Sequence, residues 1–132
     1  MRSGYSDNLD QNELAMWRGR VASATRGKRG QAMLQMLLKA LDEMPEKRLI
    51  RDELIDTGGG VCLLGAGGKA MGFADLDKID PEDHETLAQR FNVAACLIQE
   101  IEYMNDEEPY GREETPEQRY SRVREWLTKQ IK

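Results

Sequence analysis

The glycine-rich centre of the sequence, residues 58–72, is the segment whose residue types come closest to a known chemical motif. It holds 7 of the 12 glycines. Inside it, a run that begins with Gly65 and ends with Ala70 fits the G-x-G-x-x-G/A pattern of dinucleotide-binding loops. Glycines in such loops let the backbone approach a pyrophosphate at the N-terminus of the next helix. The pattern is therefore a candidate nucleotide site of an enzyme.

The flanking residues do not supply the strand and helix that this motif needs. The apolar run before it, residues 61–64, is short for a strand, and Gly72 interrupts the helix that would follow. Lys69 does not complete a P-loop either, because Ala70 stands where that motif has Ser or Thr. We therefore expect residues 61–71 to form a short glycine-bearing helix or a close-packed turn, with nucleotide binding as a remote alternative.

The charges of the chain are unevenly distributed along the sequence. The net charge is −5, but residues 1–51 carry 10 Lys and Arg against 6 Asp and Glu, whereas residues 52–132 carry 9 against 18. Such a chain can present a basic patch on one side and an acidic face on the other. The alternative is that folding mixes the two sets of charges.

Five cations form the best candidate for a binding site. Arg26, Lys28 and Arg29 stand beside glycines at the start of a predicted helix, where free N–H groups and the helix dipole favour an anion. Arg18 and Arg20, one or two helical turns earlier, extend the patch. The partner would be a phosphate, a nucleic acid or an acidic protein surface. The alternative is a solvated turn whose cations pair with carboxylates of the same chain.

Other chemical patterns in the sequence are weaker. Residues 85–101 have the rhythm of a helix-turn-helix, but the candidate recognition helix offers Gln99, Glu100 and Glu102 and no cation toward DNA. The acidic residues between positions 75 and 85 do not have the spacing of an EF-hand calcium loop.

The single histidine and the two cysteines offer little for catalysis. His84 lies in a charged helix start, so we expect it to be solvated. Cys62 and Cys96 lie inside apolar runs, which predicts two buried thiols, and the three residues are too scattered for a zinc site. We expect no catalytic residue, no cofactor and no bound metal ion.

The spacing of apolar residues predicts an all-α fold. The residues expected to face inward include Met33, Leu34, Leu37 and Leu41, then Ala94, and finally Tyr120, Val123, Leu127 and Ile131. Helices are expected over residues 10–25, about 30–43, 80–91, 93–104 and 115–131. Residues 46–56 are ambiguous, and their apolar spacing suits a short helix better than a strand. The sum is a compact bundle of about five to seven helices that forms a single domain over residues 1–132.

Helix starts and stops support these boundaries. Asp10 with Glu13, and Thr115 with Gln118, have the spacing of capping boxes. An N-cap at Asp80 would begin the helix over residues 80–91. The first two helices would form a hairpin with a basic connection. No apolar run approaches the roughly 20 residues of a membrane helix, and no signal peptide is visible, so we expect a cytoplasmic protein with no membrane contact.

Two stretches of the sequence resemble a known group of proteins. They are Trp17-Arg18-Gly19 through Gly30-Gln31, and Met44-Pro45-Glu46-Lys47-Arg48-Leu49-Ile50. Together they resemble a group of small, uncharacterised proteins encoded by tailed phages and prophages, and the similarity extends over most of the chain. This resemblance implies a phage accessory protein acting in the cytoplasm of a bacterial host, and it carries over no site residues.

These observations favour a non-enzymatic phage or prophage accessory protein that binds a host or phage macromolecule. A protein partner is favoured, and inhibition of a host defence or regulatory protein is a role that fits. Nucleic-acid binding through the turn from Arg26 to Arg29 is the alternative. A nucleotide-dependent enzyme that uses the Gly65 motif is the remote alternative. A homodimer is compatible with the thin core that this composition allows.

Overall fold

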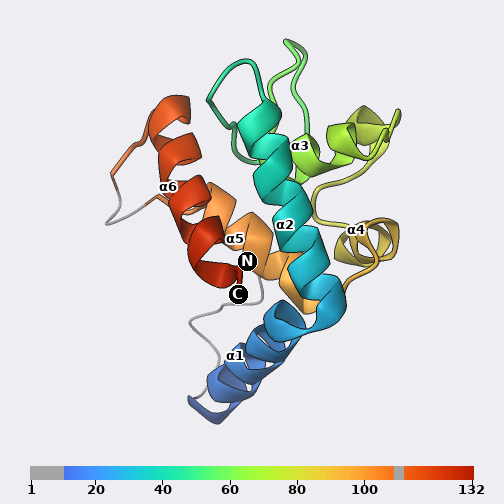
Figure 1. Cartoon of the computed structure of the whole chain (residues 1–132), viewed down its shortest axis with the longest axis vertical. Coiled ribbons are helices and arrows are strands. Elements are labelled where there is room, and N and C mark those ends of the chain that lie inside the picture. Colours follow the sequence, from blue (N-terminus) through green and yellow to red (C-terminus); the bar gives the residue numbers. More distant parts are fainter. Residues whose placement is uncertain (1–10, 109–111) are drawn as a thin grey trace.

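The computed structural model describes residues 11–108 and 112–132, which form six α-helices, one short 3₁₀-helix and an isolated β-bridge. The helices are α1 (Gln11–Arg26), α2 (Lys28–Glu43), α3 (Leu63–Ala70), η1 (Leu76–Lys78), α4 (His84–Phe91), α5 (Ala95–Asp106) and α6 (Pro116–Gln130). Figure 1 shows α2 at the centre of the molecule, with α6 on one side and α3 and α4 on the other. The predicted all-α class is confirmed.

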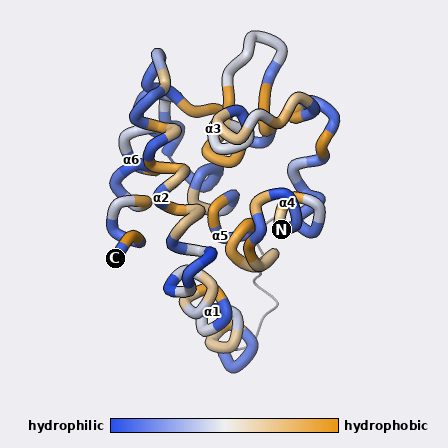
Figure 2. The backbone as a smooth tube through the Cα atoms, turned by 45° about the vertical axis from the view of Figure 1, so that its right-hand side comes forward, coloured by the Kyte–Doolittle hydropathy of each residue, from blue (hydrophilic) through white to orange (hydrophobic). Residues whose placement is uncertain are grey.

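The core forms around α2, whose apolar stripe faces inward as the sequence predicts. Met33, Leu34, Leu37 and Leu41 are buried in one hydrophobic cluster. That cluster includes residues of α3, α4, α5 and α6, and α2 packs directly against α3 and α6. Figure 2 shows the most hydrophobic stretches near α3 and α5, in the middle of the molecule.

Helix α1 contributes little to this core. Val21 is its one buried residue, and α1 packs against α2 and α5. Gly27 alone separates α1 from α2, and Figures 1 and 2 show α1 projecting from the lower end of α2. The predicted hairpin is therefore wrong: one connecting residue is too few to reverse the chain, so the two helices meet at an elbow.

Residues 46–56 do not form the short helix that their spacing favoured. The backbone N–H of Leu49 donates to Pro116 O at 3.0 Å, and that of Ile50 donates to Val61 O at 2.9 Å. An isolated antiparallel bridge joins Ile55 to Val61. The prediction fails because these backbone groups pair with distant segments instead of with the next turn of a helix.

Helices α4 and α5 begin later than predicted. Asp83, not Asp80, is the N-cap of α4, and its carboxylate accepts from Thr86 N at 3.2 Å. At the end of α4, Asn92 adopts a left-handed conformation with φ 58°, and Val93 N then bonds back to Ala88 O at 3.0 Å. Because Val93 belongs to this C-terminal cap, α5 does not begin at Val93 and starts instead at Ala95.

The predicted start of α6 is confirmed. Thr115 and Gln118 form a reciprocal capping box, with Pro116 in the first turn. Tyr120, Val123 and Leu127 are buried as expected, and the Tyr120 hydroxyl donates to Leu41 O at 2.7 Å. The capping box predicted at Asp10 lies outside the described residues. Two further inward placements differ: Ala94 is exposed, and Ile131 is only partly buried.

Candidate functional site

The glycine motif lies in α3, which is buried in the core. The Leu63 N–H donates to Asn105 Oδ1 at 3.0 Å, and the Gly65 N–H donates to Cys62 Sγ at 3.3 Å. These are N–H groups of the first helical turn, which would have to face a pyrophosphate in a dinucleotide site. Because protein atoms already occupy them, they are not available to such a ligand.

The glycines of α3 allow close packing instead. A Cβ at position 65 would lie 1.9 Å from Leu54 O, and one at position 67 would lie 2.5 Å from Leu37 Cδ2. At position 68 the nearest atom would be Leu76 Cδ2, at 2.6 Å. All three distances are shorter than side chains tolerate. The expected close-packed, glycine-bearing helix over residues 61–71 is therefore what forms, as Leu63–Ala70.

In the second glycine run, residues 58–60, the backbone N–H groups form hydrogen bonds with Asp56. The Asp56 carboxylate accepts from Gly58 N at 3.0 Å and from Gly60 N at 2.8 Å. Gly59 has φ +87° and donates to Asp56 O at 3.1 Å. Asp56 thus takes the position that an anionic ligand would occupy in a glycine turn.

A buried polar cluster lies at the N-terminal end of α3. His84 Nε2 lies 2.9 Å from Glu102 Oε2, and the two side chains are 13% and 7% exposed. Asn105 Nδ2 donates to Asp106 Oδ1 at 2.8 Å, while its Oδ1 caps Leu63 as described above. The expectation that His84 is solvated is wrong, because its ring packs against Glu102 of α5 and is largely shielded from solvent.

The contacts of this cluster join α4 to α5 and α5 to α3. Burial lowers the pKa of His84 even though four acidic neighbours on its own segment raise it. Burial also raises the pKa of the Cys62 thiol to about 12, which leaves no thiolate near neutral pH. The cavity beside Glu102 and Asp106 measures about 10 Å³, whereas ligand sites take roughly 300 Å³ or more.

The basic patch predicted from sequence becomes part of a larger surface, which we name the basic elbow. Its members are exposed cations of α1, of the first turn of α2 and of the C-terminal end of the chain: Arg18, Arg20, Arg26, Lys28, Arg29, Lys129 and Lys132. The five predicted residues all lie on α1 or at the start of α2. They occupy different sides of the junction.

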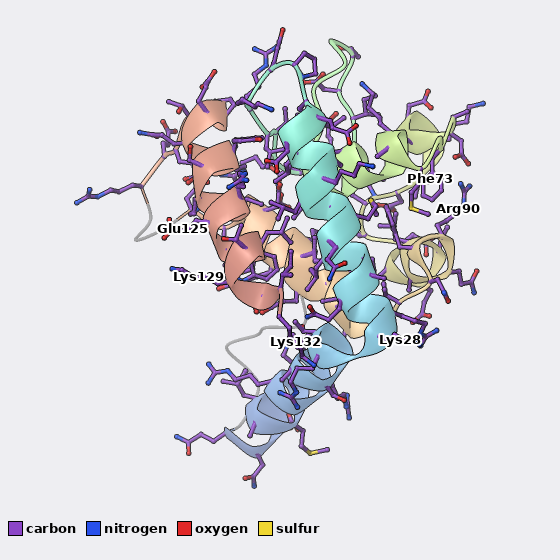
Figure 3. All side chains as sticks on the ribbon, viewed as in Figure 1. Lys28, Phe73, Arg90, Glu125, Lys129 and Lys132 are labelled. Atoms are coloured by element: carbon purple, nitrogen blue, oxygen red, sulfur yellow. The ribbon has the colours of Figure 1, made fainter. Side chains whose placement is uncertain are left out.

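Hydrogen bonds hold the C-terminal end of the chain against the elbow. Lys132 Nζ donates to Arg26 O at 2.8 Å, and Lys132 N donates to Gln31 Oε1 at 2.9 Å. Gln31 Nε2 in turn donates to Gln130 O at 3.0 Å. Figure 3 shows Lys129 and Lys132 at the lower end of α6 and Lys28 at the lower end of α2. Lys129 and Lys132 were not predicted to belong to this patch, and no local pattern in the sequence identifies them.

Two hollows flank the junction of α1 and α2. The larger, about 510 Å³, is lined by three cations, Arg18, Arg26 and Lys129, together with the carboxylate of Glu100. The smaller, about 250 Å³, has Lys28 and Arg29 on its wall. Arg20 faces the start of α5, where its charge opposes the burial that raises the pKa of the Cys96 thiol. The cations thus surround the elbow instead of forming one stripe.

The cations of the elbow are mostly unpaired among the described residues. Within that part of the chain, Arg18, Arg20, Arg26 and Lys28 form no ion pair. Arg29 donates to Asn92 Oδ1 at 3.2 Å, and Lys129 lies 3.2 Å from Glu125. Six arginines elsewhere in the described part of the chain are paired with carboxylates: Arg48, Arg51, Arg90, Arg119, Arg122 and Arg124. Among the described residues, carboxylates of the same chain thus pair with few of the cations of the elbow.

Comparison of the chain with protein-family models, with curated proteins and with solved structures gave no match. Over residues 11–108 and 112–132, no group of three or more His, Cys, Asp or Glu side chains is arranged to hold a metal ion. No helix in the same part of the chain is long and apolar enough to cross a membrane. Both cysteines are free thiols, with Cys62 buried and Cys96 partly buried.

Proposed function

We propose that this protein is a non-enzymatic accessory protein of a phage or prophage that binds a host or phage macromolecule through the basic elbow. The phage setting and a bacterial cytoplasm follow from the sequence resemblance. Inhibition of a host defence or regulatory protein is a role that such an accessory protein could perform. The alternative is a nucleic-acid partner that contacts the same cations.

The observation that carries this proposal is the composition of the elbow. Exposed cations from two distant parts of the chain meet there, and most of them have no carboxylate partner among the described residues. Unpaired cations that surround one junction create a positive potential there that attracts an anionic partner. Residues 52–132, which include two lysines of the elbow, are acidic overall, with 18 Asp and Glu against 9 Lys and Arg, and this favours the approach of an anionic partner at the elbow.

Capture of a protein or a nucleic acid from a bacterial lysate, with and without nuclease treatment, tests the proposal. The bait is the full chain, the variant Arg18→Glu/Arg26→Glu, or the matched control Lys69→Glu/Lys78→Glu, whose two exposed lysines lie away from the elbow. We expect a stoichiometric partner on the wild type and the control but not on the elbow variant. Equal capture by all three proteins, or turnover of a metabolite with no partner bound, would contradict the proposal.

A further inference from the structure

We infer that the basic elbow binds the phosphate backbone of a double-stranded nucleic acid. This inference rests on the proposed function and names the partner class of the same surface. It differs from the sequence-based preference for a protein partner because of three features of the described residues: the added lysines, the small number of exposed large apolar side chains at the elbow, and the absence of exposed aromatic rings.

The first feature is the number and the placement of the cations. Lys129 and Lys132 bring two positive charges to a surface that already holds the five predicted ones. Three of these residues, Arg18, Arg26 and Lys129, converge on the 510 Å³ hollow between α1 and α6. Phosphate contacts require cations that can reach successive backbone groups, and they supply most of the affinity of non-specific binding.

The second feature, the small number of exposed large apolar side chains, favours a nucleic acid over a protein partner. Protein interfaces depend on a desolvated centre with large apolar or aromatic anchors. Among the described residues, the exposed large hydrophobic side chains are Met16 and Met71. Met71 follows α3, away from the elbow, whereas Met16 lies on α1, two residues before Arg18. Small residues such as Ala22, Ser23 and Gly27 line the two hollows. Among the described residues, the elbow therefore offers several cations and one exposed large apolar side chain, which is little apolar area for the centre of a protein interface.

The third feature, the absence of exposed aromatic rings among the described residues, favours a double strand over a single strand. Proteins that bind single strands stack the bases on exposed aromatic rings. No aromatic side chain is exposed in the described part of the chain, and Trp17, the ring nearest the elbow in sequence, is partly buried. A duplex keeps its bases stacked internally and presents phosphates outward, so it matches a surface of cations without rings. We expect binding with little dependence on base sequence.

The position of Glu100 predicts how one substitution would change the affinity for a duplex. Its carboxylate lines the same hollow as Arg18, Arg26 and Lys129. A negative charge among these cations weakens the attraction for phosphate. Replacement of Glu100 by Gln should therefore raise the affinity for a duplex severalfold, whereas a purely structural role of Glu100 would give no gain.

The test is fluorescence anisotropy of the full chain with a labelled 20-base-pair DNA duplex. An RNA duplex and a single strand of the same sequence serve as the comparison probes. We expect duplex affinity to fall about 100-fold between 50 and 200 mM salt, as follows from about four neutralised phosphates. The single strand should bind more weakly. Stronger binding of the single strand, or affinity that does not change with salt, would overturn the inference.

Three double variants locate the site. Lys28→Glu/Arg29→Glu and Lys129→Ala/Lys132→Ala should each weaken duplex binding about tenfold or more, whereas Lys69→Ala/Lys78→Ala should leave it within twofold. Circular dichroism melting of each variant confirms that it folds. Equal binding by all variants would overturn the inference.

The two proposals fail in different ways. If a protein partner from the nuclease-treated lysate depends on the elbow while duplex binding does not, the nucleic-acid inference is wrong and the proposed function stands. If neither partner depends on the elbow, both are wrong.

Discussion

Some residues that resemble part of a binding motif serve instead to pack the core of this protein. Gly65, the first residue of the apparent dinucleotide motif, lies against the backbone of Leu54, with no room for a methyl group. Asn105 caps the helix N-terminus that the motif would have turned toward a phosphate. The motif was correctly assigned to a close-packed element from its flanks, but its packing partners could not be predicted because they come from distant segments.

Replacement of Gly65 by Ala should destabilise the protein. The added Cβ would meet Leu54 O at 1.9 Å, and a backbone atom cannot move aside as a side chain can, so a loss of about 1–3 kcal/mol is expected. Gly19→Ala is the control, since position 19 lies in α1 with nothing within 4 Å of the added atom. Urea denaturation measures both. Equal effects on the free energy of unfolding would contradict the packing role.

His84 predicts a dependence of stability on pH. Burial lowers its pKa in the folded state, so the folded protein binds the proton less readily than the unfolded chain does. The stability that neutral His84 contributes is therefore present above the unfolded pKa of about 6.5 and is lost as the pH falls below it.

Urea denaturation at pH 7.5, 6.5 and 5.5 tests this sign. The wild type should lose more stability on acidification than His84→Gln does, because glutamine can still donate to Glu102 but does not titrate. A wild type that gains stability relative to the variant at pH 5.5 would show instead a charged imidazolium paired with Glu102.

The boundaries of the helices could be predicted where the residues that define them lie close together in the sequence. The α2 stripe and the capping box at Thr115 are read from residues a few positions apart, and both occur as expected. Residues 46–56 were misassigned because their backbone groups bond to other parts of the chain, and local patterns contain no information on such partners. The start of α4 was misassigned because Asp83, a nearby residue with an equally suitable side chain, is the N-cap in place of Asp80.

The capping box at Thr115 should contribute measurably to stability. Thr115 Oγ1 accepts from Gln118 N at 3.1 Å, so Thr115→Ala leaves that N–H group of α6 without its partner and should cost about 1 kcal/mol. Ser121→Ala, at an exposed position within the same helix, is the control and should be neutral or slightly stabilising. Thermal melting compares them. A larger loss for Ser121→Ala would contradict the assignment of the cap.

In the whole molecule, cations from both ends of the sequence meet at the elbow. The five predicted cations lie within a dozen positions of one another, so their grouping was readable from sequence. Lys129 and Lys132 lie about a hundred residues away along the chain and reach the elbow because α6 packs against α2. The composite surface is thus a product of the fold, and it is what gives the elbow its proposed partner.

The most direct test of the basic elbow is a titration of the isotope-labelled full chain with a 20-base-pair DNA duplex, followed by amide NMR shifts. We expect the shifts to concentrate in residues 18–30 and 129–132, on both sides of the elbow, and to leave residues 56–72 unchanged. Shifts centred on the glycine-rich segment, or no shifts at duplex concentrations that saturate other non-specific binders, would contradict the account.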